Sequence, residues 1–185
     1  SSSQALAFNV DRPYDRSSIP VKYKINPKNT PFGSDLIREA ANKWTGHAGF
    51  DFTFSFEGES AEERLTSYNN VYMDDGRMGD NTLGLCWFYY RNGLRAGFDI
   101  AFNGTTNWNR GRFMNTAIHE FGHALGLYLS DESNAVMKPH VGYPYIVDIQ
   151  SDDVAGAAYL YPLPNDPGVV EPPVPDPPEL PGLLS

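Results

Sequence analysis

The stretch His119-Glu120-Phe121-Gly122-His123 lies inside a longer segment, residues 112–125, whose apolar side chains recur at helical spacing. The expected buried stripe of this helix consists of Phe113, Ala117, Phe121 and Ala124. Residues four positions apart lie on one face of a helix, so the imidazoles of His119 and His123 project side by side. Two neutral imidazole nitrogens at this separation can chelate one Zn²⁺ ion.

Glu120 follows the first histidine, where its carboxylate can reach a metal-bound water without binding the metal itself. This arrangement is the one that metal-assisted amide hydrolysis needs. The alternative is a helix whose two histidines only form hydrogen bonds in the core. With four histidines in 185 residues, a chance match to the pattern arises about once in a few hundred sequences. Gly126, three residues past His123, is also placed to end the helix and turn the chain.

The residues beyond the helix extend this pattern to a known family. The full set is His119 to Leu127, Ser130, Ala135-Val136-Met137 and Pro139. It resembles the matrixins, the matrix-metalloproteinase branch of the metzincin zinc endopeptidases. The resemblance implies that His119 and His123 are zinc ligands and that Glu120 is the general base. It also implies that Gly126 turns the chain and that Met137 lies in a methionine turn beneath the metal. It covers most of residues 8–163 and is most specific around 119–139.

The sequence departs from the family at one ligand. Matrixins carry a third histidine three residues after the glycine, and here that position is Leu129, which cannot bind zinc. A catalytic zinc typically has three protein ligands. Asp131 could take the vacant place if the loop is rearranged, and an exposed loop acid is the plainer interpretation. His140 is another candidate donor, with a surface histidine as its plainer interpretation. The remaining alternatives are a water ligand or a domain that no longer holds zinc.

Alternating and helical patterns predict an α+β fold with a mixed five-stranded sheet and three helices. The resemblance implies that this fold is a metzincin-like catalytic domain and that the helix with the two histidines is its active-site helix. Strands are expected at 19–26, 50–56, 71–73, 83–90 and 98–102, with Asn92-Gly93 as a hairpin turn. The other helices are expected at about 34–44, capped by Ser34 and stopped by Gly46, and at about 152–161, capped by Ser151. The first strand–helix–strand unit indicates a right-handed crossover between parallel strands.

The last residues differ in composition from this domain. Eight prolines and four acidic residues, with no basic residue, lie among residues 164–185. Such a segment favours an extended state and cannot form a core. The sequence therefore predicts a metallopeptidase domain over residues 1–163 and a proline-rich acidic linker or tail over 164–185. The alternative is that this segment is a ligand for a separate domain that binds polyproline helices.

The predicted function is that of a zinc-dependent endopeptidase that hydrolyses peptide bonds of extended protein substrates through a metal-activated water. The alternative is a catalytically impaired domain of the same fold that binds proteins or peptides without cleaving them. Leu129 favours this alternative, whereas the intact Glu120 favours the enzyme. A purely structural secreted domain would leave the paired histidines unexplained.

The resemblance also implies where a substrate binds. The edge strand Leu83–Phe88 would pair with an extended peptide, so Leu83 and Leu85 are candidate substrate-binding residues. Residues 139–145 correspond to the wall of the main side-chain pocket, where Tyr143 or Tyr145 would favour an apolar residue after the cleaved bond. Plain packing is the alternative interpretation of both tyrosines.

Composition excludes several other classes of protein. The net charge is −9 and the chain has no Lys/Arg cluster, so nucleic acid and anionic membranes are not expected partners. No run of 18 apolar residues occurs, so membrane insertion is not expected.

Cys86 is the only cysteine, which excludes an intrachain disulfide, and a buried strand thiol is a better interpretation than a nucleophile. We expect a monomer, and the family and the tail indicate a secreted, extracellular protein, although the first residues lack the features of a signal peptide.

Two secondary sites remain as expectations. Asp74, Asp75, Asp80 and Asn81 form a loop rich in oxygen donors that could bind Ca²⁺, a cation that the family also binds; solvated turn acids are the alternative. Asn103-Gly104-Thr105 fits an N-glycosylation acceptor. A second, structural zinc is not expected, because only His47 and His140 remain to bind it.

Overall fold

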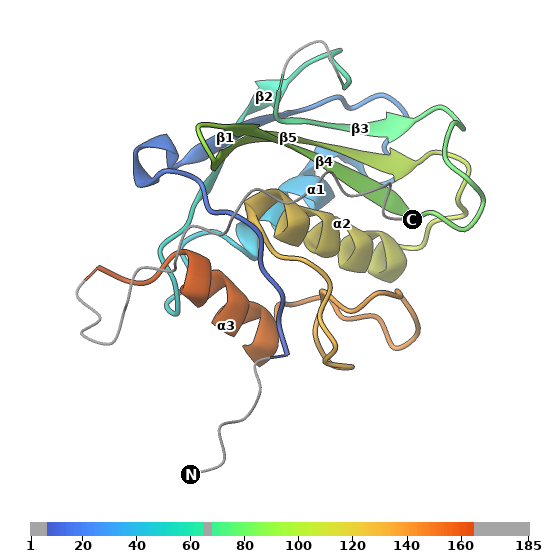
Figure 1. Cartoon of the computed structure of the whole chain (residues 1–185). Helices are drawn as coiled ribbons and strands as arrows, with labels where there is room; N and C mark the ends of the chain where they lie inside the picture. Colours follow the sequence, from blue (N-terminus) through green and yellow to red (C-terminus); the bar gives the residue numbers. More distant parts are fainter. Residues whose placement is uncertain (1–6, 65–67, 165–185) are drawn as a thin grey trace.

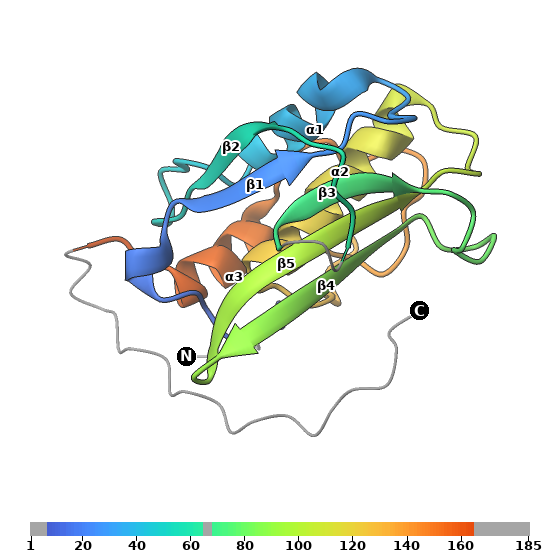
Figure 2. The same cartoon turned by 90° about the horizontal axis from the view of Figure 1, so that it is seen from above.

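The computed structural model describes residues 7–64 and 68–164, which form a mixed sheet covered on one side by helices (Figures 1 and 2). The sheet has five strands in the order β2-β1-β3-β5-β4. In chain order the elements are η1 (Arg16–Ser18), β1 (Val21–Ile25), α1 (Gly33–Asn42), β2 (Phe54–Glu59), β3 (Asn70–Asp74), β4 (Gly84–Arg91), β5 (Leu94–Asn103), α2 (Arg110–Leu125) and α3 (Ser151–Leu160). The predicted α+β class, the five-stranded mixed sheet and the three helices are confirmed.

Strand β1 pairs in parallel with β2 and β3, and β3 pairs in parallel with β5. The predicted parallel unit β1-α1-β2 is therefore present. The prediction placed the start of β2 too early, because Phe50 and Phe52 lie before the strand. Both rings are nevertheless buried, and the Phe52 ring packs 4.7 Å from that of Tyr161. The alternating pattern there records burial against Trp44 and Tyr161. Residue 51 between the two rings bonds to the chain after α3 instead of to the sheet, since the Asp51 N–H donates to the Tyr161 carbonyl.

Strands β4 and β5 form the predicted hairpin. Asn92 and Gly93 have φ of 52° and 77°, the left-handed conformation that a two-residue turn of this kind requires. Strand β4 pairs only with β5 and lies at the edge of the sheet, so its outer backbone groups are free of sheet partners among the described residues. The edge next to the candidate metal helix is thus open to an added strand.

Two predicted helix caps are wrong. Helix α1 begins at Gly33, which has φ +71°, and Ser34 lies inside its first turn, where its hydroxyl donates to Glu59 instead. Ser151 is the first residue of α3 rather than its cap, and Gln150 occupies the cap position. The Gln150 N–H donates to the Asp153 carboxylate at 2.8 Å. In this cap the side chain of Asp153 accepts from the N–H of Gln150, three residues earlier in the chain. The cap therefore depends on a pair of residues, and Ser151 alone does not indicate it.

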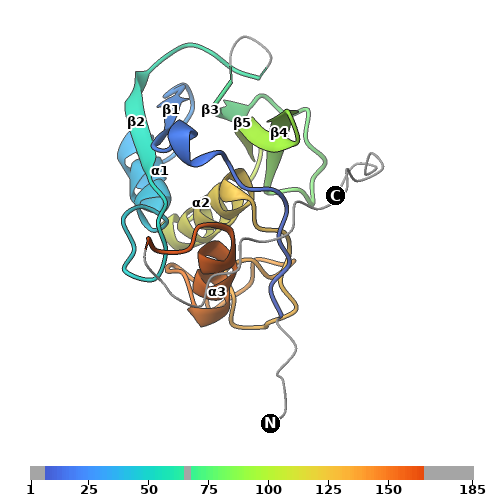
Figure 3. The ribbon, with the colours of Figure 1, turned by 60° about the vertical axis from the view of Figure 1, so that its left-hand side comes forward.

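Helix α2 lies at the centre of the molecule, between the sheet and α3 (Figure 3). All four residues of its predicted buried stripe are fully buried. On the sheet side, the Phe121 ring packs 5.1 Å from that of Phe54 and 5.4 Å from that of Tyr23. The helix ends as predicted at Gly126, which has φ +124° and whose N–H bonds to the Gly122 and His123 carbonyls.

The predicted methionine turn packs directly against α2 at Gly122. Met137 is 1% exposed. A Cβ atom at Gly122 would clash with the Met137 sulfur and lie 3.0 Å from the Trp44 ring. This contact requires glycine in the middle of a helix, although glycine is a weak helix former.

None of the described helices combines the length and the apolar composition needed to span a membrane. Residues 165–185 of the predicted tail lie outside the described residues.

We expect Gly122→Ala to lower the free energy of unfolding by about 1–3 kcal/mol, because overpacking at the Met137 contact outweighs the better helix propensity of alanine. Urea denaturation measures this change. Gly142→Ala is the control, since no heavy atom lies within 4 Å of its added Cβ. A Gly122→Ala variant as stable as the wild type would contradict the close approach.

Candidate metal centre

His119 and His123 lie next to each other on α2, as their spacing predicts. Their ring centroids are 4.7 Å apart and the rings are nearly perpendicular, at 87°. His119 is buried and His123 is half-buried. The pair therefore forms a single site at the C-terminal half of the helix.

A backbone carbonyl lies behind each ring. His119 Nδ1 is 2.8 Å from the Val136 carbonyl oxygen, and His123 Nδ1 is 2.8 Å from the Leu127 carbonyl oxygen. A carbonyl only accepts, so Nδ1 of each ring carries the proton and Nε2 keeps its lone pair. Burial lowers the pKa of His119 and lowers that of His123 to about 3, so both imidazoles are neutral at physiological pH. Two neutral nitrogens with free lone pairs fit a zinc ion.

The carbonyl behind His119 is itself held in place by α3. The Asp153 carboxylate accepts from the Val136 N–H at 2.9 Å and from the Met137 N–H at 3.1 Å. Nothing in the sequence pattern around Asp153 indicates a contact with the methionine turn. Its link to His119 runs through backbone atoms, for which the sequence carries no signal.

Glu120 faces the edge strand. A Cβ added to Gly84 would lie 2.8 Å from Glu120 Oε1, so the carboxylate rests against the start of β4. Glu120 is 6% exposed, and burial raises its pKa to about 8. A carboxylate whose pKa lies near neutrality is suited to accept and return a proton.

In the part of the chain that the structure describes, no third protein ligand lies with the two histidines. Among residues 7–64 and 68–164, no group of three or more His, Cys, Asp or Glu side chains is arranged to hold a metal ion. Asp131 and His140, the two candidates from the sequence, are exposed. Leu129 is half-buried, and its carbonyl accepts from the Asn9 side chain at 2.9 Å.

Comparison with known proteins places this chain in a family. A family model described as matrixin matches residues 15–162. The chain belongs to the matrixin family. Relatives include stromelysin-3 of Xenopus laevis (30% identical, covering 76% of this chain) and matrix metalloproteinase-20 of Homo sapiens (30%, covering 75%). A third is the hatching enzyme of Paracentrotus lividus (33%, covering 69%). The matches span 29%, 30% and 22% of the lengths of these relatives, so the chain covers less than a third of each.

The candidate substrate-binding residues of this matrixin lie on or beside β4 and in the loop after the methionine turn. Leu83 immediately precedes β4, and Leu85 lies within it; both are half-buried. Tyr143 is 89% exposed. Its ring is therefore available to a bound peptide and does not wall a closed pocket. The Tyr145 hydroxyl lies 3.2 Å from the Asn109 side-chain nitrogen, which donates to it and holds the loop against the start of α2.

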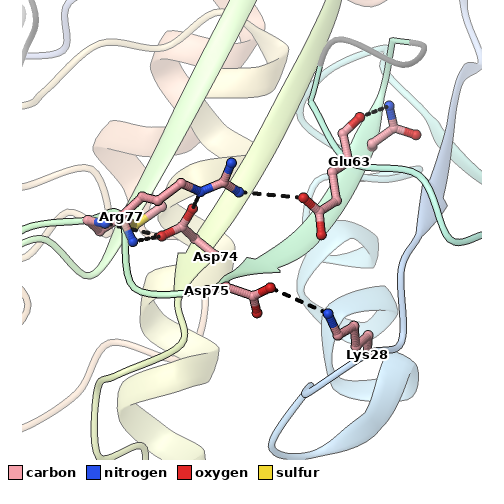
Figure 4. Close-up of polar contacts among 7 residues, drawn as sticks. Lys28, Glu63, Asp74, Asp75 and Arg77 are labelled. Carbon is pink, nitrogen blue, oxygen red and sulfur yellow. Dashed lines mark hydrogen bonds and ion pairs between the residues drawn. The ribbon is translucent and has the colours of Figure 1, made fainter.

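Basic side chains pair with two acidic residues at the end of β3 and in the loop after it (Figure 4). The Asp74 carboxylate accepts from Arg77 Nε at 2.8 Å and from the backbone N–H groups of Arg77 and Met78. Asp75 pairs with Lys28 at 3.4 Å. Two of the acids expected to bind calcium therefore already have cationic partners within the chain.

Two further expectations concern single residues. Asn103, in the glycosylation pattern, is buried, and its amide nitrogen donates to the carbonyls of Gly79 and Thr82. The folded chain thus does not present this side chain to a glycosylating enzyme. Burial raises the pKa of the Cys86 thiol, which agrees with a structural rather than a nucleophilic role.

The raised pKa of Glu120 predicts a pH-dependent stability of the metal-free protein. Between about pH 4.5 and about pH 8, the folded state holds a proton that the unfolded chain has released, so the free energy of unfolding falls as the pH rises, by up to about 1.4 kcal/mol per pH unit. Glu120→Gln lacks this contribution. We expect the difference in stability between wild type and variant, measured by urea denaturation, to change by about 2–3 kcal/mol from about pH 5.5 to about pH 7.5. Parallel pH profiles would show that the carboxyl is not desolvated.

Proposed function

We propose that this domain is a zinc-dependent endopeptidase that hydrolyses peptide bonds of extended protein substrates. One observation carries the proposal: one helix supplies both a pair of neutral imidazoles with free Nε2 lone pairs and a buried carboxyl group. A structural helix has no need of this combination, since its histidines could be satisfied by any hydrogen-bond partner. Membership of the matrixins, a family of zinc endopeptidases, supports the same function.

His119 and His123 would hold the metal through Nε2. Zinc supplies Lewis acidity, which lowers the pKa of water and polarises a carbonyl. Glu120 would take a proton from the attacking water and deliver it to the leaving amine. Burial raises the proton affinity of this group, which makes its ionised form a stronger base toward the water proton. Among the candidates for a third ligand, we keep Asp131 as a proposal that would require movement of its loop.

The free edge of β4 supports an extended substrate. A peptide that added to this edge would run past Gly84, against which the Glu120 carboxylate rests. Leu83, Leu85 and Tyr143 would contact its side chains. We also propose that calcium, if bound, lies elsewhere than at Asp74 and Asp75, whose carboxylates face Arg77 and Lys28.

The organisation and location of the protein are proposed from its composition and from its family. We propose a catalytic domain over residues 1–163, a proline-rich linker or tail over 164–185, a monomeric state and a role outside the cell. Matrixins are mostly secreted, and this supports the location. Neither nucleic acid nor a membrane is a proposed partner, because the net charge is −9.

Leu129 favours a second candidate function. Without a third protein ligand among the described residues, the domain could bind peptides along β4 without cleaving them. The two functions differ in whether zinc is held tightly enough to act.

We expect cleavage of an unstructured protein to be abolished by a zinc chelator and to fall by about 10²–10⁴-fold in Glu120→Gln, because the general base is lost. Product formation measured by mass spectrometry is the readout. Glu132→Gln, which neutralises an exposed acid, is the control and should retain full activity. Cleavage that survives both the chelator and Glu120→Gln would refute the enzyme, and absence of cleavage in the zinc-saturated wild type would support the binding function.

Leu129→His tests the vacant ligand position. We expect the affinity for zinc to rise at least about tenfold, because a third imidazole completes the usual ligand set. Competition against a chromophoric chelator measures the dissociation constant. Leu129→Ala controls for loss of the leucine side chain. Equal affinities in all three proteins would mean that the segment after Gly126 does not bring position 129 to the metal.

A further inference from the structure

The N-terminal segment, defined here as residues 9–12, pairs with the chain that follows α2 (Figure 3). The Asp11 N–H donates to the Gly126 carbonyl at 2.8 Å, and the Tyr128 N–H donates to the Asn9 carbonyl at 2.8 Å. Val10 and Leu127 are directly opposed in this antiparallel bridge. The two segments therefore form a small ladder beside the metal centre.

The pairing decides where the polar groups of Leu127 point. The two ladder bonds flank the Val10–Leu127 pair, so the N–H and C=O of Leu127 face away from the N-terminal segment. On that other side the Leu127 N–H donates to the Gly122 carbonyl at 2.9 Å. The Leu127 carbonyl accepts from His123 Nδ1 at 2.8 Å. The ladder thus directs the carbonyl that fixes the tautomer of His123.

A buried ion pair holds the ladder in place. Arg95 Nη2 lies 2.7 Å from the Asp11 carboxylate, and the two side chains are 0% and 5% exposed. The Tyr90 hydroxyl donates to the same carboxylate, and Arg95 Nε donates to the Arg12 carbonyl at 3.3 Å. The Arg95 guanidinium also lies 4.5 Å from the centre of the Phe88 ring. The N-terminal segment is therefore tied to both strands of the β4–β5 hairpin.

We propose that Asp11 is a positioning residue for His123. By pairing with Arg95 it fixes the N-terminal segment, the segment fixes the direction of the Leu127 carbonyl, and this carbonyl keeps the His123 Nε2 lone pair free for the metal. The metal-binding part of the proposal rests on the proposed zinc function, whereas the tautomer part concerns the metal-free chain alone.

The two histidines provide an internal comparison. His119 is oriented by Val136, which is held by Asp153 on α3. Among the described residues, the backbone hydrogen bonds of residues 9–12 lead to Gly126 and Tyr128 and not to Val136. A general loss of stability would affect both rings. A positioning role of Asp11 would affect His123 and leave His119 unchanged.

The experiment records long-range ¹H–¹⁵N spectra of the imidazoles in the full-length, metal-free chain, followed by zinc titration against a competing chelator. The proteins compared are wild type, Asp11→Ala and Asp11→Asn. Asp51→Ala, which removes an acid from an exposed pair with Arg16, controls for lost negative charge. Ile25→Ala, which truncates a fully buried side chain on β1, controls for lost stability.

We expect wild-type His123 to show a protonated Nδ1 and an unprotonated Nε2. In Asp11→Ala the His123 signals should move toward a mixture of tautomers, His119 should keep its signals, and the dissociation constant for zinc should rise about 10- to 100-fold. Asp11→Asn should shift the same signals less, and it decides the matter if Asp11→Ala does not fold. Neither control should reproduce the pattern.

Three results would overturn the proposal. The first is a protonated Nε2 on wild-type His123, and the second is an unchanged His123 in whichever Asp11 variant is folded. The third is an equal change in both histidines, as expected from lost stability. If the wild type binds no zinc, the proposed function fails, but the imidazole spectra still test the role of Asp11.

Discussion

A carbonyl oxygen behind each imidazole is the interaction on which the candidate metal centre depends. Spacing along α2 places His119 and His123 together, but it leaves each ring free to rotate and to carry its proton on either nitrogen. The Val136 and Leu127 carbonyls remove this freedom. Each carbonyl belongs to a segment outside the helix, so the centre exists only when the chain has closed around the end of α2.

The surroundings of α2 follow from this requirement. Gly122 has no side chain, so the methionine turn can lie against the helix and bring Val136 behind His119. Gly126 adopts φ +124°, so the chain can reverse and bring Leu127 behind His123. The helix is buried along most of its length, and the two turns approach it at its C-terminal half. The same contacts therefore pack the helix against its neighbours and orient the two imidazoles.

Sequence patterns predicted the helices and strands well. They failed where a structural feature depends on backbone atoms or on residues far away in the sequence. The periodicity around Phe113 and Phe121, the Asn92-Gly93 turn and the spacing of the two histidines depend on local geometry, and the structure has all three. The early start predicted for β2 was wrong, because Phe50 and Phe52 alternate for burial against Trp44 and Tyr161. Asp153 and Asp11 carry no local sequence signature of these contacts. Asp153 accepts from backbone N–H groups of the methionine turn, and Asp11 pairs with the Arg95 side chain on β5. The sequence shows Leu129 as a departure from the family pattern. Its effect on metal affinity depends on how the folded loop places position 129, which the sequence does not give.

The arginine in the loop after β3 has a consequence for the whole domain. Arg77 supplies the positive charge that neutralises Asp74, and it is covalently part of the chain. A loop organised in this way carries its own counterion, so the Asp74 carboxylate is neutralised without a divalent cation. Its order is instead sensitive to ionic strength, because the Arg77 side chain is 68% exposed and the ion pair is open to screening.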